Sequence, residues 1–312
     1  MLRFILIRLA TTIPTLLGMS FVAFAIVALA PGDPVMMELR AMGIVPKPED
    51  IEALRARFGL DKPLLQRYFE WLARAIRFDF GSSVATGRTV ISEIGIHLPA
   101  TLTLAISSLI GAVLISLGLG AFAVTSGRVV GAGLRGLTIL LVSVPSFWLA
   151  LLLIHIFILQ LGWGRLVGEG TWYDLVLPTL TLSLGAGASL GRFVFERVRA
   201  EKSEDYVRLA IAKGLGPSRI MISHIAPRII GPLATAWANT FGALLGGAVI
   251  VESIFGWPGL GQLILQAIAQ RDFPVIQAYL VFMGLIFFAT SLFADIIVII
   301  SDPQLRKRLD RE

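Results

Sequence analysis

The sequence predicts an all-α integral membrane protein with six transmembrane helices. Its 312 residues are 56% hydrophobic and only 15% charged, and the mean hydropathy is +0.81. A soluble domain usually carries about 25% charged residues. Apolar runs long enough for a membrane-spanning helix, about 20 residues, recur along the chain. The segments between these runs differ strongly in Lys and Arg content, as the loops of a multi-pass protein do.

The first apolar run is predicted to be an uncleaved membrane helix. It exceeds the usual apolar length of a signal peptide, and no small-residue cleavage site ends it. It stops instead at Ala-Pro-Gly-Asp-Pro, a sequence that turns the chain out of a helix. The six expected spans are residues 9–30, 100–125, 135–160, 175–195, 230–251 and 276–300.

Basic residues predict that both termini are cytoplasmic. With that orientation the cytoplasmic segments carry 16 Lys and Arg against 7 acidic residues. The two short external loops, 161–174 and 252–275, contain only Arg165 and Arg271 against four acids. Positive charge collects in cytoplasmic loops. The cytoplasmic segments would be residues 1–8, 126–135, 192–228 and the tail after 300.

Residues 31–99 are predicted to form an external helical segment. Apolar residues recur there at helical spacing, and Gly-Leu-Asp-Lys-Pro separates two stripes. Two interpretations stay open: a cap that packs on the membrane domain, and a surface that contacts a delivery protein or lines an outer vestibule. The stripes are Ile51, Leu54 and Phe58, followed by Leu64, Tyr68, Leu72 and Ile76.

The residues of the chain do not predict an enzyme. No stretch matches the phosphate-binding G-x-x-x-x-G-K-[ST] pattern, and the chain has no cysteine. Its three histidines are far apart, so no metal site is expected. His155 lies in a span and is a candidate pathway residue, as a proton relay or metal ligand. A hydrogen bond to a neighbouring helix is the preferred interpretation of this histidine.

A polar segment, EDYVRLAIAKGLGPSRIMISHIAPRI (204–229), separates the fourth and fifth spans. It is predicted to form a helix, a Gly-Pro break and a second helix. An amphipathic helix lying on lipid is one alternative. A DNA-reading helix-turn-helix is disfavoured because both ends are tethered to spans. Since the spans contain no relay of charged residues, energy is expected to enter here from a cytoplasmic partner.

This segment resembles the EAA loop of ABC-importer permeases. Arg208, Leu209 and Ala210 stand at the EAA block, Gly214 at the following Gly, and Pro227 thirteen residues further on. Only Ala210 matches the EAA letters, which is typical of the peptide/nickel branch of the family. The candidate coupling residues are Arg208, Leu209, Ala210, Lys213, Gly214, Leu215 and Pro227.

The resemblance extends over nearly the whole chain, in order. It implies a type I ABC importer permease fold with an N-terminal helix (1–30), the external segment (31–99), a five-helix core (100–300) with a coupling loop (197–229), and a tail (301–312). The further stretches that carry it are RLATTIPTLLGMSFVAFAIVALAPGDP, FGLDKPLLQRYFEWL, FDFGSS, HLPATLTL, SVPSFWLALLLI, VLPTLTLSL, VESIFGWPGLGQLILQAIAQRDFPVIQAY and SDPQLR.

The resemblance also implies partners. They are a second homologous permease, two cytoplasmic ATPase subunits that use ATP and Mg²⁺, an external solute-binding protein, and the lipid of the bacterial cytoplasmic membrane. No cofactor bound by this chain and no nucleic acid are expected. Two other classes stay open: an ion-gradient-driven secondary transporter and a membrane-embedded enzyme.

A helix break after the fifth span is the candidate outer gate. The resemblance implies a short return toward the membrane that closes the outer mouth, whereas a tryptophan there could also be an interface anchor. The residues are Glu252, Trp257, Pro258, Gly259 and Gly261.

The substrate is expected to be a small peptide or a nickel or metal-chelate complex. WPGLGQL, RDFPVIQAY, FADII and FDFGSSVATGRTV are most similar to members that handle nickel or opine-type metallophores. Similar phrases occur in peptide permeases, so both classes stay open.

Overall fold

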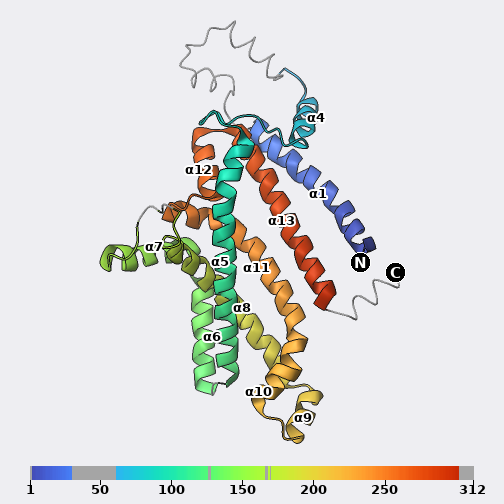
Figure 1. Cartoon of the computed structure of the whole chain (residues 1–312), viewed down its shortest axis with the longest axis vertical. Coiled ribbons are helices and arrows are strands. Elements are labelled where there is room, and N and C mark those ends of the chain that lie inside the picture. The colour runs from blue at the N-terminus through green and yellow to red at the C-terminus, as the bar shows by residue number, and fades with distance from the viewer. Residues whose placement is uncertain (1, 30–60, 126–127, 166–167, 169, 302–312) are drawn as a thin grey trace. The chain divides into compact units, whose positions relative to one another are not determined.

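A computed structural model describes residues 2–29, 61–125, 128–165, 168 and 170–301 (Figure 1). Its regular elements are helices, and one isolated bridge joins Ser82 to Thr89. The chain divides into two compact units, which are described one at a time. The first expected stripe of the external segment and the tail after residue 301 lie outside the described residues.

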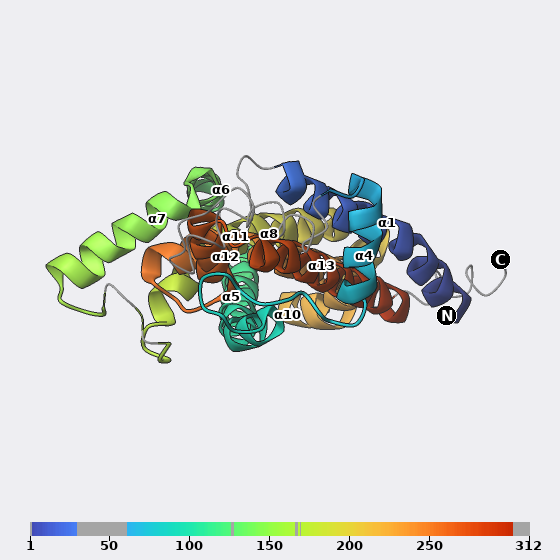
Figure 2. The ribbon, with the colours of Figure 1, turned by 90° about the horizontal axis from the view of Figure 1, so that it is seen from above.

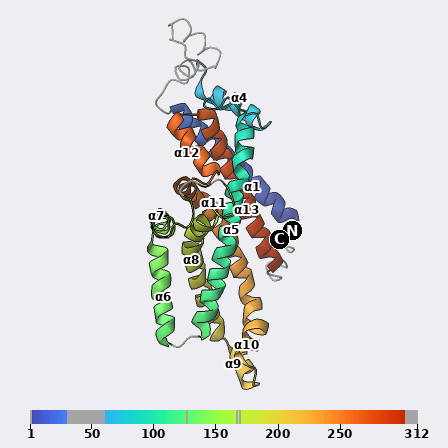
Figure 3. The same cartoon turned by 60° about the vertical axis from the view of Figure 1, so that its left-hand side comes forward.

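The larger unit comprises residues 1–4, 100–261 and 289–312. Within it α8 contacts α6, α7 and α11, and in the view of Figure 3 α8 lies between α6 and α5. Its elements are most of α5 (Val90–Thr125), α6 (Arg128–Ser143), α7 (Ser146–Leu153), the π-helical η1 (Ile154–Gln160), α8 (Val176–Lys202), α9 (Asp205–Ala212), α10 (Pro217–Ile220), the π-helical η2 (Met221–Ile225) and α11 (Ala226–Phe255).

Small residues bring α5 and α8 into close contact. A Cβ added to Gly120 would lie 2.4 Å from Val194, and one added to Gly187 would lie 2.8 Å from Ile115. Helices in lipid associate through such close packing because lipid tails are as apolar as leucine. These two glycines therefore set the distance between the helices.

The expected count of six spans is not confirmed. Among the described residues four helical segments are long and apolar enough to cross a membrane. A fifth is present if the two helices on either side of Pro145 are counted as one span, although they are bent by 97° (Figure 2). The four are Ala10–Leu29, Val90–Gly120, Pro217–Phe255 and Phe273–Ile297.

Two local causes explain the difference. Pro145 has no N–H and disfavours helical backbone at Val144, so the expected span 135–160 breaks there. The expected span 175–195 is helical, within α8, but Gly, Ser and Thr lower its apolar content. The same small residues pack against neighbouring helices.

The smaller unit comprises residues 5–99 and 262–288. Within it Gly284 of α13 packs against Met19 of α1: an added Cβ would lie 2.6 Å from the methionine sulfur. The elements are α1 (Leu2–Leu29), α4 (Leu64–Ala75), the first turns of α5, most of α12 (Leu260–Gln270) and the first part of α13 (Phe273–Ser301).

Helix α4 packs on α1 through aromatic residues. Tyr68 and Trp71 are buried, and the Tyr68 hydroxyl lies 2.8 Å from the hydroxyl of Ser20. The ring of Tyr68 meets that of Phe24 edge-on at 5.7 Å. Tyr68 belongs to the expected second stripe, whereas Ile76 of that stripe is 70% exposed. These contacts fit the cap interpretation of the external segment.

A buried aspartate joins the loop before α5 to the turn before α13. Asp272 is 1% exposed and accepts hydrogen bonds from the Ser83 hydroxyl at 2.5 Å and the Ala85 N–H at 3.2 Å. Its other carboxylate oxygen accepts from the N–H of Val275 in the first turn of α13. The FDFGSS and RDFPV stretches therefore meet in space.

Candidate functional site

Helices α9 and α10 form a compact projection between α8 and α11, in the 197–229 loop (Figure 1). Helix α9 ends at Ala212, and Gly214, whose φ is +77°, follows its C-cap residue Lys213. The Gly214 N–H donates to the Ile211 carbonyl at 2.9 Å, and the Leu215 N–H donates to the Ala210 carbonyl at 3.1 Å. These two bonds form a Schellman motif, which requires a left-handed residue and favours glycine. The predicted turn at Gly214 is therefore present.

The inner face of this projection is firmly packed. Apolar side chains of α9, α10 and η2 form one buried cluster with residues of α8 and α11. Leu215 packs against it from the turn after Gly214. Displacement of α9 must therefore displace the ends of both long helices. The buried members are Val194, Val198, Val207, Ala210, Ile220, Ile225, Ile229 and Leu233.

Tyr206 adds a polar connection between three helices. Its hydroxyl donates to Glu201 of α8 at 2.5 Å, and the guanidinium of Arg228 in α11 lies 4.0 Å from its ring centre. Burial, with the Glu201 carboxylate, raises the pKa of Tyr206 to about 12. Tyr206 is not among the coupling residues that the sequence predicts. Glu201 and Tyr206 lie on either side of a helix break, so helical spacing does not pair them.

The outer face of the α9–α10 projection, meaning the face exposed to solvent, carries most of the predicted coupling residues. Ala210 is buried and Leu215 is half-buried, whereas the other five are exposed. Leu209 is 57% exposed, and Ile211 and Ile222 are 62% and 71% exposed. Exposed apolar side chains thus stand among basic ones on this face. The exposed predicted residues are Arg208, Leu209, Lys213, Gly214 and Pro227.

The 252–261 turn brings three of the candidate gate residues together. Glu252 is fully buried, and its carboxylate accepts the Gly261 N–H at 2.6 Å. A Cβ added to Gly259 would lie 2.4 Å from that carboxylate. One added to Gly261 would lie 2.4 Å from the backbone of Val249. Neither position therefore has room for a side chain larger than that of glycine.

Trp257 and the neighbouring Leu260 connect this turn to helix α5. Its indole N–H donates to the Ala100 carbonyl at 2.9 Å, and the Leu260 N–H donates to the Thr101 hydroxyl at 2.7 Å. The HLPATLTL and GWPGLG stretches thus meet. Trp257 is 3% exposed, which argues against the alternative of an interface anchor. Pro258 is half-buried and lies beside Gly170.

His155 lies in η1 and is exposed. Its Nε2 is 3.1 Å from Nε2 of Gln160, in the same helix. In the described chain the π-helical turn thus brings Gln160 of the same helix within reach of His155, and the role of His155 in the pathway stays a prediction. The described residues contain no group of three His, Cys, Asp or Glu side chains that could hold a metal.

A cavity of about 240 Å³ lies at the α6–α7 bend, between α8 and α11. Its polar side chains are three hydroxyls, and none of its lining residues is charged. Small side chains complete the wall. The lining residues are Val144, Ser146, Leu149, Thr181, Leu182, Gly185, Ala186, Thr240, Ala243, Leu244 and Gly247.

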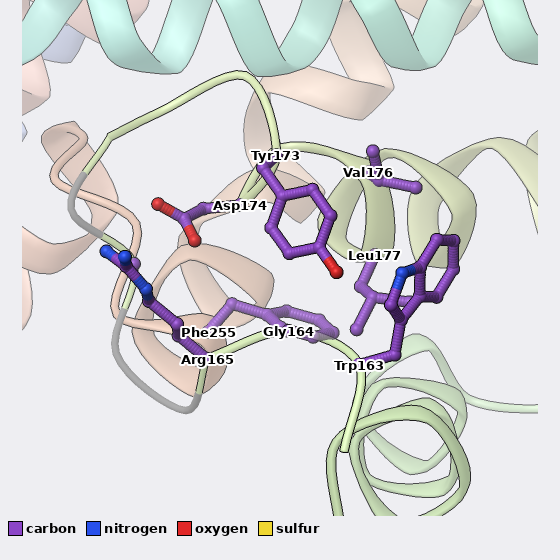
Figure 4. A pocket seen from close by; sticks show the side chains of 9 residues that line it. Trp163, Gly164, Arg165, Tyr173, Asp174, Val176, Leu177 and Phe255 are labelled. Carbon is purple, nitrogen blue, oxygen red and sulfur yellow. The ribbon is translucent and has the colours of Figure 1, made fainter. Parts of the chain in front are cut away.

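A second, smaller pocket lies between the loop before α8 and the end of α11 (Figure 4). Arg165 and Asp174 lie on one side of it and Trp163 on the other. The rings of Trp163 and Tyr173 meet edge-on at 6.0 Å. Phe255 forms part of the wall, so this pocket adjoins the beginning of the 252–261 turn.

Comparison with known proteins decides the family. Residues 112–307 match the model described as "binding-protein-dependent transport system inner membrane component", and residues 1–105 match its N-terminal counterpart. The chain belongs to this family. It is thus a permease subunit of an ABC importer and a multi-pass inner-membrane protein. Permeases of this family are not themselves enzymes, and they work with ATPase and substrate-binding partners.

Relatives match the permease over nearly its full length. The glutathione transport system permease protein GsiC of Escherichia coli (strain K12) is 34% identical over 307 residues, covering 98% of this chain and 99% of the relative. GsiC of Salmonella choleraesuis (strain SC-B67) is 36% identical with the same coverage.

Solved structures support the fold. An inward-facing structure of the MetNI methionine ABC transporter aligns with a TM-score of 0.57 at 19% identity, covering 66% of this permease and 94% of that chain. An amino acid ABC transporter with histidines aligns with a TM-score of 0.52, covering 67% and 94%. About two thirds of the chain is therefore similar in fold to these transporter chains, which supports the type I permease fold.

Proposed function

We propose that this permease forms half of the translocation pathway for small peptide-like solutes in an ATP-driven importer. A second homologous permease would form the other half, two ATPase subunits would bind on the cytoplasmic side, and an external protein would deliver the solute. The observation that carries this proposal is the 197–229 loop, with an apolar and basic outer face and a packed inner face.

Energy would enter through α9. Exposed Leu209 and Ile211 offer an apolar contact to an ATPase cleft, and Arg208 and Lys213 offer positive charge beside it. Hydrophobic side chains at the centre of a contact contribute most of the binding energy, and charges at its rim mainly select the partner. ATP and Mg²⁺ would be bound by the ATPase subunits and not by this chain.

Helix α11 would carry the movement from one site to the next. It begins at Ala226 within the 197–229 loop, where the Arg228 guanidinium lies over the ring of Tyr206. Thr240 and Gly247 then line the cavity at the bend, and Glu252 holds the 252–261 turn. Because a packed helix moves as a rigid element, a shift at the loop would alter the cavity and the turn together.

The cavity lining supports a peptide-like cargo. A bare divalent cation would need carboxylate or imidazole ligands, and none of the lining side chains provides one. The hydroxyls of Ser146, Thr181 and Thr240 can donate to and accept from peptide groups. The curated relatives are named glutathione permeases. A metal chelate, which presents ligand atoms and not the ion, is the second candidate because of the stretches similar to nickel and metallophore permeases.

Reconstitution of the complete transporter in proteoliposomes tests this function. ATP hydrolysis and uptake of labelled glutathione, dipeptides and a nickel chelate would be measured with and without the binding protein. Peptide-dependent stimulation of both is expected. Stimulation by the nickel chelate alone would reject the peptide assignment. Uptake driven by an ion gradient without the ATPases would reject the importer mechanism in favour of a secondary transporter.

A further inference from the structure

A shallow cleft between α5, α6 and α8 contains two arginines, and none of the sites described above uses it. Leu119, Leu134 and Phe195 form its apolar surface, and Arg135 and Arg192 line it. Thr138 adds a hydroxyl. We call this feature the arginine cleft. It combines positive charge with an apolar floor in one place.

The two arginines have no acidic partner in the described part of the chain. The Arg135 guanidinium lies 5.7 Å from the ring centre of Phe195, and no acidic side chain lines the cleft. Glu196 follows Arg192 by one helical turn but forms no ion pair with it among the described residues. Both guanidinium groups are therefore available to an anion, and each can bind a phosphate through two parallel N–H groups.

Each of the two arginines lies at one end of a long stretch of the sequence that contains no charged residue. After Arg135, the next Lys, Arg, Asp or Glu is Arg165. On α8 no such residue precedes Arg192 back to Val176. Arginines at the ends of apolar stretches lie at the depth of lipid head groups. The apolar floor of the cleft is the surface that an acyl chain would cover.

We propose that the arginine cleft binds the phosphate of an anionic phospholipid, with an acyl chain against Leu119 and Leu134. Basic pockets between membrane helices recognise such head groups because both the charge and the apolar contact are satisfied at once. A bound lipid would contact both α6 and α8, and α6 continues from the cleft to the cavity at the α6–α7 bend. The site would make the stability of the permease depend on anionic lipid.

The test uses the complete transporter in nanodiscs of phosphatidylcholine with or without phosphatidylglycerol. Retention of spin-labelled phosphatidylglycerol over phosphatidylcholine is measured for the unaltered permease and for the double variant Arg135→Gln/Arg192→Gln. A loss of roughly 25-fold in this preference is expected, since each of two cations near the membrane surface contributes about fivefold. The double variant Arg197→Gln/Arg199→Gln removes equal charge from the same helix end and should retain the preference.

Three results would overturn the proposal. Equal loss in both double variants would mean diffuse surface charge and not a site. Displacement of the lipid by inorganic phosphate, dependent on Arg135 and Arg192, would mean a soluble-anion site. Unchanged lipid preference with weakened subunit assembly would mean that a partner protein covers the cleft. Thermal unfolding in pure phosphatidylcholine verifies that each variant is folded, and the lipid measurement does not depend on which solute is transported.

Discussion

Two turns of the permease rely on glycine for different physical reasons. At Gly214 an added Cβ would meet no atom within 4 Å, but φ is +77°. At Gly261 an added Cβ would lie 2.4 Å from the backbone of Val249. The first turn therefore needs the backbone freedom of glycine, and the second needs its small volume. The comparison teaches that one residue type can be required for its backbone conformation in one place and for its small volume in another.

The largest effect is expected for Gly261→Ala. Its new methyl group would meet the backbone of Val249 and the carboxylate of Glu252, and a backbone in mid-helix cannot move aside. Overpacking of this kind costs about 3 kcal/mol. Thermal unfolding of the detergent-solubilised transporter measures the loss. Gly246→Ala is the matched control, since an added Cβ there meets nothing within 4 Å; equal stability of the two variants would contradict the packing argument.

Glu252→Ala should have the next largest effect. The carboxylate accepts the Gly261 N–H at 2.6 Å within a fully buried turn. Removal of the acceptor would leave the buried Gly261 N–H unpaired, which costs roughly 2 kcal/mol. Uptake and thermal stability should fall together because the turn loosens. An unaltered unfolding temperature would show that Glu252 does not hold the turn.

Gly214→Val should separate ATP hydrolysis from uptake while leaving membrane insertion intact. A β-branched residue in a left-handed conformation costs about 1–2 kcal/mol, and the end of α9 would relax to avoid it. The ratio of solute transported to ATP hydrolysed measures the effect. Gly214→Asn should retain more coupling, because asparagine tolerates this conformation. Gly216→Ala, at φ −68°, is the control. Normal uptake by Gly214→Val would reject the proposal that energy enters through α9.

Tyr206→Phe should have the smallest effect. The variant retains the ring beneath Arg228 but loses the hydrogen bond to Glu201, which is worth about 1 kcal/mol. The folded state raises the pKa of Tyr206 from 10.0 to about 12. Folding thus favours the neutral phenol, so its stabilising contribution is complete below pH 10 and declines as pH rises toward 12. Unfolding of both proteins between these pH values measures this decline, and parallel curves would contradict it.

Local features were predictable from the sequence. The helical spans at both ends of the chain follow from uninterrupted apolar runs, and the turn at Gly214 follows from the rarity of left-handed backbone in other residues. The fourth expected span lies in α8, which has 27 residues but is not apolar enough to count as a span, because Gly, Ser and Thr replace apolar residues along it. Pro145 in the sequence indicates a helix break, but the angle of the bend depends on how the surrounding helices pack.

Long-range contacts were not predictable. Asp272 accepts a hydrogen bond from Ser83, 189 positions away, and Trp257 donates to Ala100, 157 positions away. No periodicity or turn rule relates residues at such separations.

The sequence by itself therefore determined that the chain is a membrane protein, that a polar loop separates two of its helices, and that a turn lies at Gly214. Each of these features depends on a few neighbouring residues and on the solvent they face. Tertiary structure alone decided that Glu252 is buried against two glycines, that Tyr206 connects three helices, and that Arg135 and Arg192 line one cleft. These outcomes depend on how closely helices approach one another, and that distance is set by side chains from every helix in the contact.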